Sequence, residues 1–160
     1  MVSGDEFRAT TGTFATGVTV VTTNDAGDDH GMTVNSFASV SIDPPLVLMS
    51  ADKETTSHDR IQSADHYAVN VLTADQEWIS NRFAGEHHEM DDPFEDIPVV
   101  RAETGAPIFE ECLAFLDCAL WAAYEGGDHT IYVGEVTALD VRRPDADPLT
   151  FYRGEYGTVD

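Results

Sequence analysis

The chain has 160 residues, of which 42% are hydrophobic, so it can bury a sizeable single core and is too apolar for an acidic disordered protein. Asp and Glu number 30 against 8 Lys and Arg, and the formal net charge of −22 argues against binding to nucleic acid or to an anionic membrane. The acids are spread along the whole chain, which favours a protein adapted to a salt-rich cytoplasm, as in a halophile, over one with an acidic binding surface. No signal peptide or apolar span is readable, so we expect one cytoplasmic domain over residues 1–160.

The first part of the chain predicts a helix followed by a β-hairpin. Residues 3–13 predict a short helix, with Ser3 or Asp5 as its N-cap. The β-branched run 18–23 predicts a buried strand. The Asn, Asp and Gly residues of 24–29 predict the turn after it.

The stretch 31–50 predicts two strands joined at Asp43-Pro44-Pro45. Its first half places Thr33, Asn35 and Ser36 where strand formers are expected. Small polar side chains in an apolar strand suit the polar edge of a flat ligand.

The polar segment 51–60 is rich in hydroxyl side chains and leads into a short helix, for which Thr56 and Asp59 resemble a capping pair. A helix N-terminus offers free N–H groups and a partial positive charge, and together these bind phosphate. Lys53, the only lysine of the chain, lies just upstream. Two interpretations of Lys53 stay open: a phosphate contact and an isolated surface lysine.

The middle of the chain predicts a strand and a capped helix. Residues 67–72 read as a strand. Thr73 and Gln76 then form a capping-box pattern that opens a helix ending at Gly85.

Two groups of residues are weak candidates for metal or thiol chemistry. His87 and His88 are adjacent on an acidic loop, where two neighbouring side chains do not easily share one metal, so a solvated loop is favoured. Cys112 and Cys118 are six residues apart and are expected on one strand face, too far apart for an easy disulfide. We therefore expect packed thiols and no metal.

The last third of the chain predicts a long hairpin. A short strand is expected at 97–101, followed by strands at 113–125 and 129–141 joined by the turn Gly126-Gly127-Asp128. Residues 148–157 bring aromatic side chains to the C-terminus. Six or seven mostly antiparallel strands with three short helices predict a small closed or nearly closed barrel. The chain has no G-x-G-x-x-G after a strand and no G-x-S-x-G, so nothing points to a Rossmann fold or a serine hydrolase.

A flat cofactor that carries a phosphate would account for both the polar strand residues and the hydroxyl-rich helix start. Its ring would lie along 33–36, and its phosphate would sit at 50–57 near the helix start. A hydroxyl-rich strand beside a hydroxyl-rich helix start suits FMN.

Several blocks of sequence, in order and at similar spacing, resemble the flavin reductase family, the small FMN-binding split-barrel reductases that supply reduced flavin to two-component monooxygenases. The resemblance runs from about Phe7 to Gly157 and rests on the blocks Phe14–Thr22, Gly31–Phe37, Asp43–Val47, Tyr67–Leu72, Arg82–Ala84, Gly127–Thr130 and Gly134–Val136. It implies an antiparallel split β-barrel with short flanking helices and a homodimer with FMN near the subunit interface.

The resemblance also implies roles for individual residues. Thr33, Asn35 and Ser36 would contact the isoalloxazine ring. The residues placed about the ribityl phosphate are Ser50, Lys53 and Ser57, with Arg82 and Phe83 nearby. His129 matches the histidine associated with nicotinamide binding, and Tyr152 and Tyr156 match C-terminal residues that approach the flavin. The acidic loop 86–96 departs from the family pattern and leaves the choice between NADH and NADPH open.

The implied function is an NAD(P)H-dependent flavin (FMN) reductase that passes hydride from nicotinamide C4 to flavin N5, with a partner monooxygenase as the consumer. His129 would position the nicotinamide or balance charge. The alternatives are a non-catalytic flavin-storage protein, a flavoprotein oxidoreductase of the same barrel with another acceptor, and an acidic interaction domain that binds no flavin. The Gly-Asp-His block favours the reductase, because storage needs no nicotinamide site.

Overall fold

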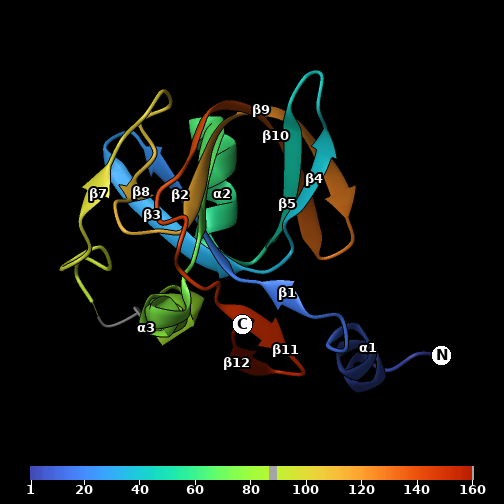
Figure 1. Ribbon diagram of the computed structural model, residues 1–160. Helices are drawn as coiled ribbons and strands as arrows, with labels where there is room; N and C mark the ends of the chain where they lie inside the picture. The colour runs from blue at the N-terminus through green and yellow to red at the C-terminus, as the bar shows by residue number, and fades with distance from the viewer. Residues whose placement is uncertain (87–89, 160) are drawn as a thin grey trace.

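The computed structural model describes residues 1–86 and 90–159, and this part of the chain is mostly β-structure with short helices (Figure 1). The helical elements are α1 (Gly4–Thr11), α2 (Thr56–Ala64), the 3₁₀ turn η1 (Ala74–Gln76), α3 (Glu77–Asn81) and the wide turn η2 (Arg82–Glu86). The strands are β1 (Thr16–Gly17), β2 (Thr19–Asp25), β3 (Asp28–Val34), β4 (Ala38–Ser41), β5 (Leu46–Asp52), β6 (His66–Val71), β7 (Val99–Val100), β8 (Ile108–Phe109), β9 (Ala114–Gly126), β10 (His129–Val141), β11 (Thr150–Tyr152) and β12 (Glu155–Gly157).

The main sheet has seven antiparallel strands in the order β3-β2-β6-β9-β10-β5-β4. It curls strongly, and α2 lies within the curl, where it packs against β2, β3, β5 and β6 (Figure 1). Among the described residues no strand pairing joins β3 to β4 or β5, although β3 and β5 lie close together. The mainly β, antiparallel architecture expected from the sequence is confirmed, and the curled sheet is open along one line.

The stretch 31–50 contains parts of three strands, not two, and this corrects the prediction. β3 ends at Val34, where its pairing with β2 ends, and 35–37 belong to no strand. The chain then enters β4, which pairs with β5 at the other end of the sheet. The polar residues Asn35 and Ser36 therefore lie on a connection between the two sheet edges.

Local capping follows the sequence closely. The Ser3 hydroxyl accepts from the Glu6 N–H at the start of α1, and the Glu6 carboxylate accepts from the Ser3 N–H. The Thr73 N–H donates to Gln76 Oε1 at 3.0 Å, as the predicted capping box requires. For α2 the cap is Thr55, whose hydroxyl accepts from the His58 N–H at 3.2 Å, so the predicted Thr56–Asp59 pair is wrong by one residue.

The core consists of two clusters, and the two cysteines belong to different ones. Cys112 precedes β9 and packs with residues such as Phe109, while Cys118 lies within β9 beside Tyr67. The prediction that both cysteines lie on one face of a strand is therefore wrong, because only Cys118 belongs to β9. Burial raises the pKa of the Cys112 thiol to about 11 and that of Cys118 to about 12. Both are packed free thiols, as predicted.

The remaining strands form two small sheets. β1 pairs with β11, and β11 pairs with β12, so the C-terminal aromatics join the N-terminal segment. β7 and β8 form a short pair, of which only Val99 and Val100 match the strand expected at 97–101.

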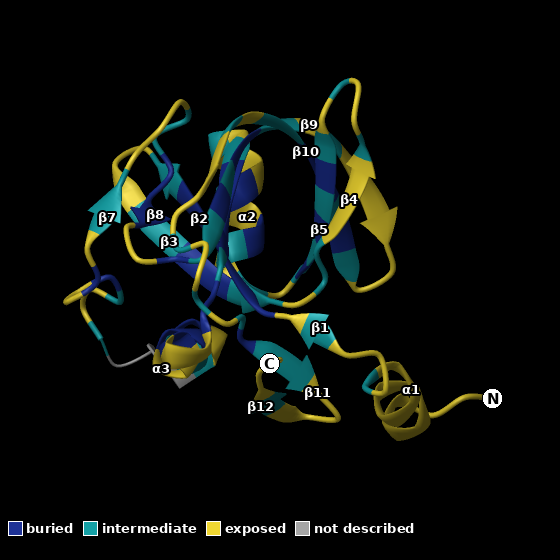
Figure 2. Cartoon of the chain, in the orientation of Figure 1, coloured by how far each residue is buried: buried dark blue, intermediate teal, exposed yellow. Residues whose placement is uncertain are grey.

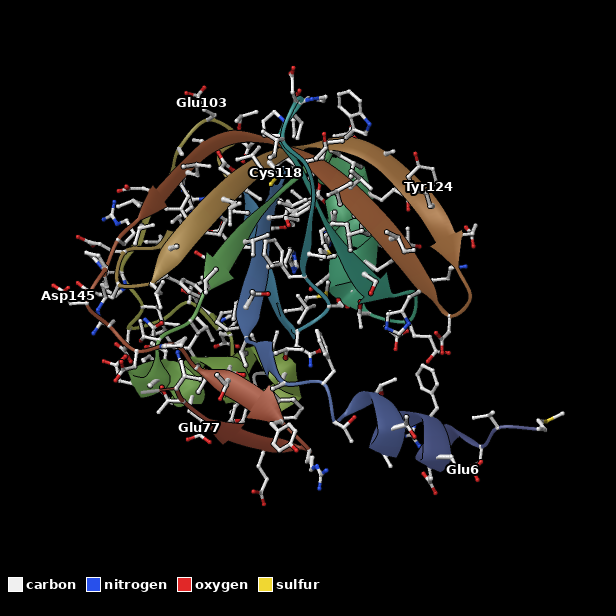
Figure 3. All side chains as sticks on the ribbon, turned by 45° about the vertical axis from the view of Figure 1, so that its right-hand side comes forward. Glu6, Glu77, Glu103, Cys118, Tyr124 and Asp145 are labelled. Carbon is white, nitrogen blue, oxygen red and sulfur yellow. The ribbon has the colours of Figure 1, made fainter. Side chains whose placement is uncertain are left out.

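The surface carries acids on many elements, as the labelled Glu6, Glu77, Glu103 and Asp145 illustrate (Figure 3). No helix in the described ranges is long and apolar enough to cross a membrane. α1 projects from the body of the molecule and has no buried residue (Figures 1 and 2). Phe7, within it, and Phe14, just after it, are exposed.

Candidate functional site

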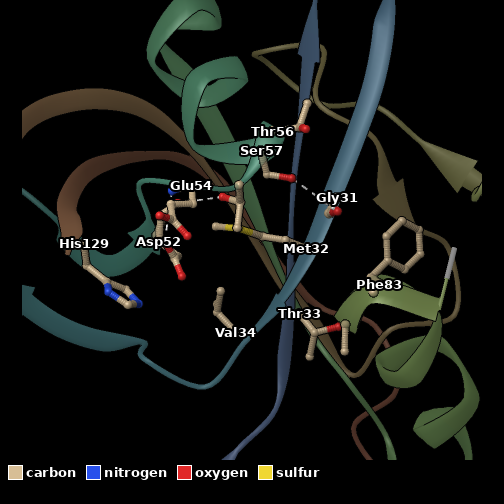
Figure 4. Close-up of a pocket in the computed structure, with 14 residues that line it drawn as sticks. Gly31, Met32, Thr33, Val34, Asp52, Glu54, Thr56, Ser57, Phe83 and His129 are labelled. Carbon is tan, nitrogen blue, oxygen red and sulfur yellow. Dashed lines mark hydrogen bonds between the residues drawn. The ribbon is translucent and has the colours of Figure 1, made fainter. Parts of the chain in front are cut away.

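A cavity of about 470 Å³ lies beside β3 where the curled sheet is open. Its lining comes from β3, the end of β5, the first turn of α2, η2 and the start of β10. Figure 4 shows His129 and Phe83 on opposite sides of the cavity, with Thr33 between them. These five segments are far apart in the sequence, so the fold alone creates the site.

The α2 side of the cavity offers hydroxyls and a helix N-terminus. Thr55, Thr56 and Ser57 line it, and Ser57 Oγ donates to the Gly31 carbonyl at 3.4 Å. The first N–H groups of a helix lack acceptors within the helix, and the helix dipole makes this end positive. This end therefore has the chemistry of a phosphate site.

Two carboxylates belong to the same side. Asp52 and Glu54 line the cavity, and Asp52 Oδ1 accepts from the Glu54 N–H at 2.9 Å. No lysine or arginine is among the described residues that line this cavity. A phosphate in this cavity would therefore meet N–H and hydroxyl donors. Arg60 lines a neighbouring cavity that shares Thr56 and Ser57, and its guanidinium is paired with Asp25 at 3.0 Å.

His129 lines the cavity at the first residue of β10, and its side chain is 41% exposed. Its Nδ1 lies 2.8 Å from Asp128 Oδ1, and this hydrogen bond lowers the pKa of the Asp128 carboxyl. The Asp128 carbonyl also accepts from the Lys53 N–H at 3.0 Å, which joins the turn before β10 to the segment before α2. Because a carboxylate accepts only, Nδ1 carries the proton, and Nε2 remains to meet a ligand.

The opposite side is apolar and tightly packed. Phe83 is only 2% exposed, and its ring lies against Gly31, where a Cβ atom would come within 2.9 Å of two ring carbons. Gly85, with φ of 122°, follows in a backbone conformation that favours glycine and ends the helix where the sequence predicted. The hydroxyl of Thr33 donates to the Ser80 carbonyl at 2.6 Å and so ties β3 to α3.

The family model described as flavin reductase like domain matches residues 11–160. The chain belongs to this family. An FMN reductase (NADH), SmoA, of Agrobacterium fabrum is 46% identical over 151 residues, which cover 94% of this chain and 83% of that protein. A flavin-dependent monooxygenase reductase subunit, HsaB, of Mycobacterium tuberculosis is 38% identical over 155 residues, covering 96% and 81%. The solved structure of the NADH:FAD oxidoreductase SgcE6 of Streptomyces globisporus superimposes with a TM-score of 0.92 at 39% identity, covering 100% of this chain and 97% of that one.

Four of the residues predicted from the resemblance to flavin reductases line the cavity. They are Thr33, Ser57, Phe83 and His129. They come from β3, α2, η2 and β10, so the fold brings together residues that the sequence separates widely.

Asn35 and Tyr156 line a smaller neighbouring cavity of about 180 Å³. It shares Thr33, Val34 and Ala84 with the first, so the two cavities meet along the end of β3. The Tyr156 hydroxyl lies 2.7 Å from Ser80 Oγ.

The other expected site residues do not line either of these two cavities. Ser36 Oγ donates to the Ser50 carbonyl and accepts from the Ser50 N–H, both at 3.1 Å, so this pair joins the connection 35–37 to β5. Lys53 Nζ contacts the Glu125 carboxylate. Each of these polar groups has a partner within the protein.

Arg82 and Tyr152 also lie outside the two cavities. Arg82 donates to the carbonyls of Pro93 and Glu95, and its guanidinium lies over the Trp78 ring. Tyr152 is 44% exposed, with the Arg153 guanidinium over its ring.

Sequence reasoning missed several lining residues. Gly31, Met32, Asp52, Glu54 and Thr56 line the cavity without having been singled out as ligand contacts. The hydroxyl-rich helix start was a usable signal for Thr56. The two acids had none, because acids occur throughout this chain. Among the described residues no group of three or more His, Cys, Asp or Glu side chains is arranged to hold a metal ion, and His87 and His88 lie outside those residues.

Proposed function

We propose that this chain is an NADH-dependent flavin reductase that uses FMN. The observation that carries the proposal is the cavity of about 470 Å³, whose polar side combines the hydroxyl-rich N-terminus of α2 with His129, opposite the apolar side at Phe83. Its volume lies in the range of small-molecule sites. The family membership and the NADH-dependent relatives support the same activity.

The residues of the cavity fit a flavin phosphate and ring. We propose that the N-terminal N–H groups of α2 with the hydroxyls of Thr56 and Ser57 hold the phosphate. The ring would lie along β3 at Thr33 and against the apolar side formed by Phe83. When bound, the flavin supplies the hydride chemistry at N5, and the protein supplies binding and orientation.

We propose that His129 orients the nicotinamide. Asp128 fixes the imidazole so that Nδ1 donates and Nε2 can accept from an N–H donor such as a carboxamide. The side chain is partly exposed, so a second substrate could reach it from solvent. No proton transfer by the protein is needed for hydride transfer itself.

The choice of cofactors and partners extends this proposal. We infer NADH over NADPH, because SmoA and SgcE6 are both named for NADH. We infer FMN over FAD, because SmoA, named for FMN, is 46% identical to this chain, whereas SgcE6, named for FAD, is 39% identical. The relative HsaB is a monooxygenase reductase subunit, so a partner monooxygenase would consume the reduced flavin here too. A homodimer is part of the proposal, and it would cover some of the exposed apolar side chains, which include Phe14, Val40, Ile42, Trp121 and Leu139.

An assay of NADH oxidation in molar KCl tests the activity. We expect turnover that depends on added FMN and falls with NADPH in place of NADH. Anaerobic reduction should bleach the flavin absorbance in proportion to the NADH consumed. Flavin binding without NADH turnover would contradict the reductase and support a storage protein. No flavin binding at all would overturn the proposal entirely.

A further inference from the structure

The buried histidine His58 joins the two polar ends of the cavity without lining it. It lies in the first turn of α2, and its side chain is 11% exposed. Its Nε2 lies 2.7 Å from Thr130 Oγ1, and Thr130 follows His129 directly in β10. One side chain therefore connects the helix turn that carries Thr56 and Ser57 to the strand that begins with His129.

The direction of the Nδ1 hydrogen bond of His58 follows from its second partner. Nδ1 lies 2.9 Å from Asp59 Oδ1, and a carboxylate can only accept, so Nδ1 carries the proton. With Nδ1 donating to Asp59, Nε2 is the ring nitrogen that meets the Thr130 hydroxyl. Both ring nitrogens are used, and the ring orientation is defined.

The backbone and ring of His58 add two further links to β10. Its carbonyl accepts from the Tyr132 hydroxyl at 3.0 Å, and its ring centroid lies 5.6 Å from that of Tyr132. Packing alone would be satisfied by an apolar side chain of similar size in this buried position. The hydrogen bond from Nε2 to Thr130 requires a polar side chain that is as long as histidine.

We propose that His58 is a positioning residue for flavin reduction: beside the backbone pairing of β5 with β10, its bond to Thr130 holds the first turn of α2 at a defined distance from His129. This inference rests on the proposed function. A flavin held by its phosphate at α2 then presents its ring at a defined distance from a nicotinamide held at His129. A flavin without a phosphate is not held at α2, so the His58–Thr130 hydrogen bond should have less effect on the rate of its reduction.

Two variants of His58 separate its two hydrogen bonds. His58→Gln extends an amide to about the place of Nε2 and can keep the bond to Thr130, whereas His58→Asn reaches only about the place of Nδ1. The readout is kcat/KM for FMN divided by kcat/KM for riboflavin, with NADH, in molar KCl. We expect His58→Asn to lower this ratio about two- to tenfold, the effect of one lost hydrogen bond. His58→Gln should restore most of it.

Thr130→Val tests the same bond from the other side. It keeps the shape of the side chain and removes the hydroxyl that meets Nε2. We expect the same fall in the ratio, and no further fall when it is combined with His58→Asn, because both changes remove one interaction. This variant also keeps the test decisive if His58→Asn does not fold, which circular dichroism would reveal.

His66 provides the matched control. It lies in β6, its Nδ1 is bonded to the Ala64 carbonyl at 2.9 Å, and its Nε2 accepts from the Asn24 N–H at 3.4 Å. His66→Asn should lower stability without changing the FMN-to-riboflavin ratio.

The outcomes are distinguishable. A wild-type protein that does not oxidise NADH with FMN overturns the proposed function. A wild-type protein that reduces FMN and riboflavin equally well overturns the positioning role, as does an unchanged ratio in both His58→Asn and Thr130→Val. An equal fall in the His66 control would show a general loss of structure and overturn the role as well.

Discussion

The two sides of the cavity are built by different forces. On the apolar side, Phe83 and Gly31 are held by packing with almost no solvent contact. On the polar side, Ser57 and His129 are held by hydrogen bonds, and His129 is partly exposed. In a close-packed region, one added carbon atom displaces its neighbours and costs stability. On a hydrogen-bonded surface, a substitution removes one hydrogen bond and leaves the others in place. Substitutions on the two sides should therefore differ in size and in which ligand they affect.

The largest effect is expected from Gly31→Ala on the apolar side. The new Cβ atom would lie 2.9 Å from two carbons of the Phe83 ring, so the ring must move. Overpacking of this kind costs about 1–3 kcal/mol of unfolding free energy. We expect FMN affinity to fall about tenfold or more, and riboflavin affinity to fall equally, because the ring side is disturbed. Denaturant unfolding and fluorescence titration measure both.

Gly17→Ala is the control for that comparison. Gly17 lies in β1, and no atom of the described residues comes within 4 Å of the position that its new Cβ would take, so the added carbon meets open space. The stability and flavin affinity of this variant should match the wild type. Equal losses in both variants would mean that the Gly31–Phe83 contact does not shape the site.

A smaller and more selective effect is expected from Ser57→Ala on the polar side. The Ser57 hydroxyl has a single proton, which would turn from its 3.4 Å bond to the Gly31 carbonyl toward the phosphate. Its loss should weaken FMN about two- to tenfold and leave riboflavin binding unchanged, because riboflavin has no phosphate. Ser63→Ala is a matched control in the same helix, since Ser63 Oγ contacts Asp25 and does not line the cavity.

Lys53→Ala decides how the phosphate end works. The sequence placed this lysine near the phosphate, but its Nζ contacts Glu125. We expect FMN affinity within about twofold of the wild type, which is below the effect of one lost hydrogen bond. A loss larger than that of Ser57→Ala would show that the lysine reaches the phosphate after all.

The smallest effect concerns salt. With Asp52 and Glu54 in the lining, no described lysine or arginine there, and a net charge of −22, an anionic ligand meets repulsion that salt screens. The screening length falls from about 10 Å at 0.1 M to about 3 Å at 1 M. FMN affinity should hold or rise modestly as KCl increases. A steep fall would show that an attractive cation dominates the site.

Much of the fold was readable from local pattern. The long hairpin of β9 and β10, the Ser3 cap, the capping box at Thr73 and the end of the helical segment at Gly85 follow from residues within a few positions of each other. The likeness of spaced blocks to flavin reductases added the family, which is confirmed.

The site could be read only in part. Thr33, Ser57, Phe83 and His129 were expected and do line one cavity, while Asn35 lines its neighbour and Lys53 lines neither. A side chain's direction depends on what surrounds it. Lys53 meets Glu125 from a strand 72 positions later, and no spacing rule reports such a contact.

The sequence by itself determined the long hairpin of β9 and β10, the Ser3 cap of α1, the capping box at Thr73 and the hydroxyl-rich start of α2, because these depend on backbone preferences and short-range hydrogen bonds. Only the tertiary structure decided that β3 and β5 approach without pairing, that α2 fills the curl, and that His58 meets Thr130. Those contacts depend on the burial of side chains from distant segments in one core. The cavity exists because the curled sheet remains open where they meet.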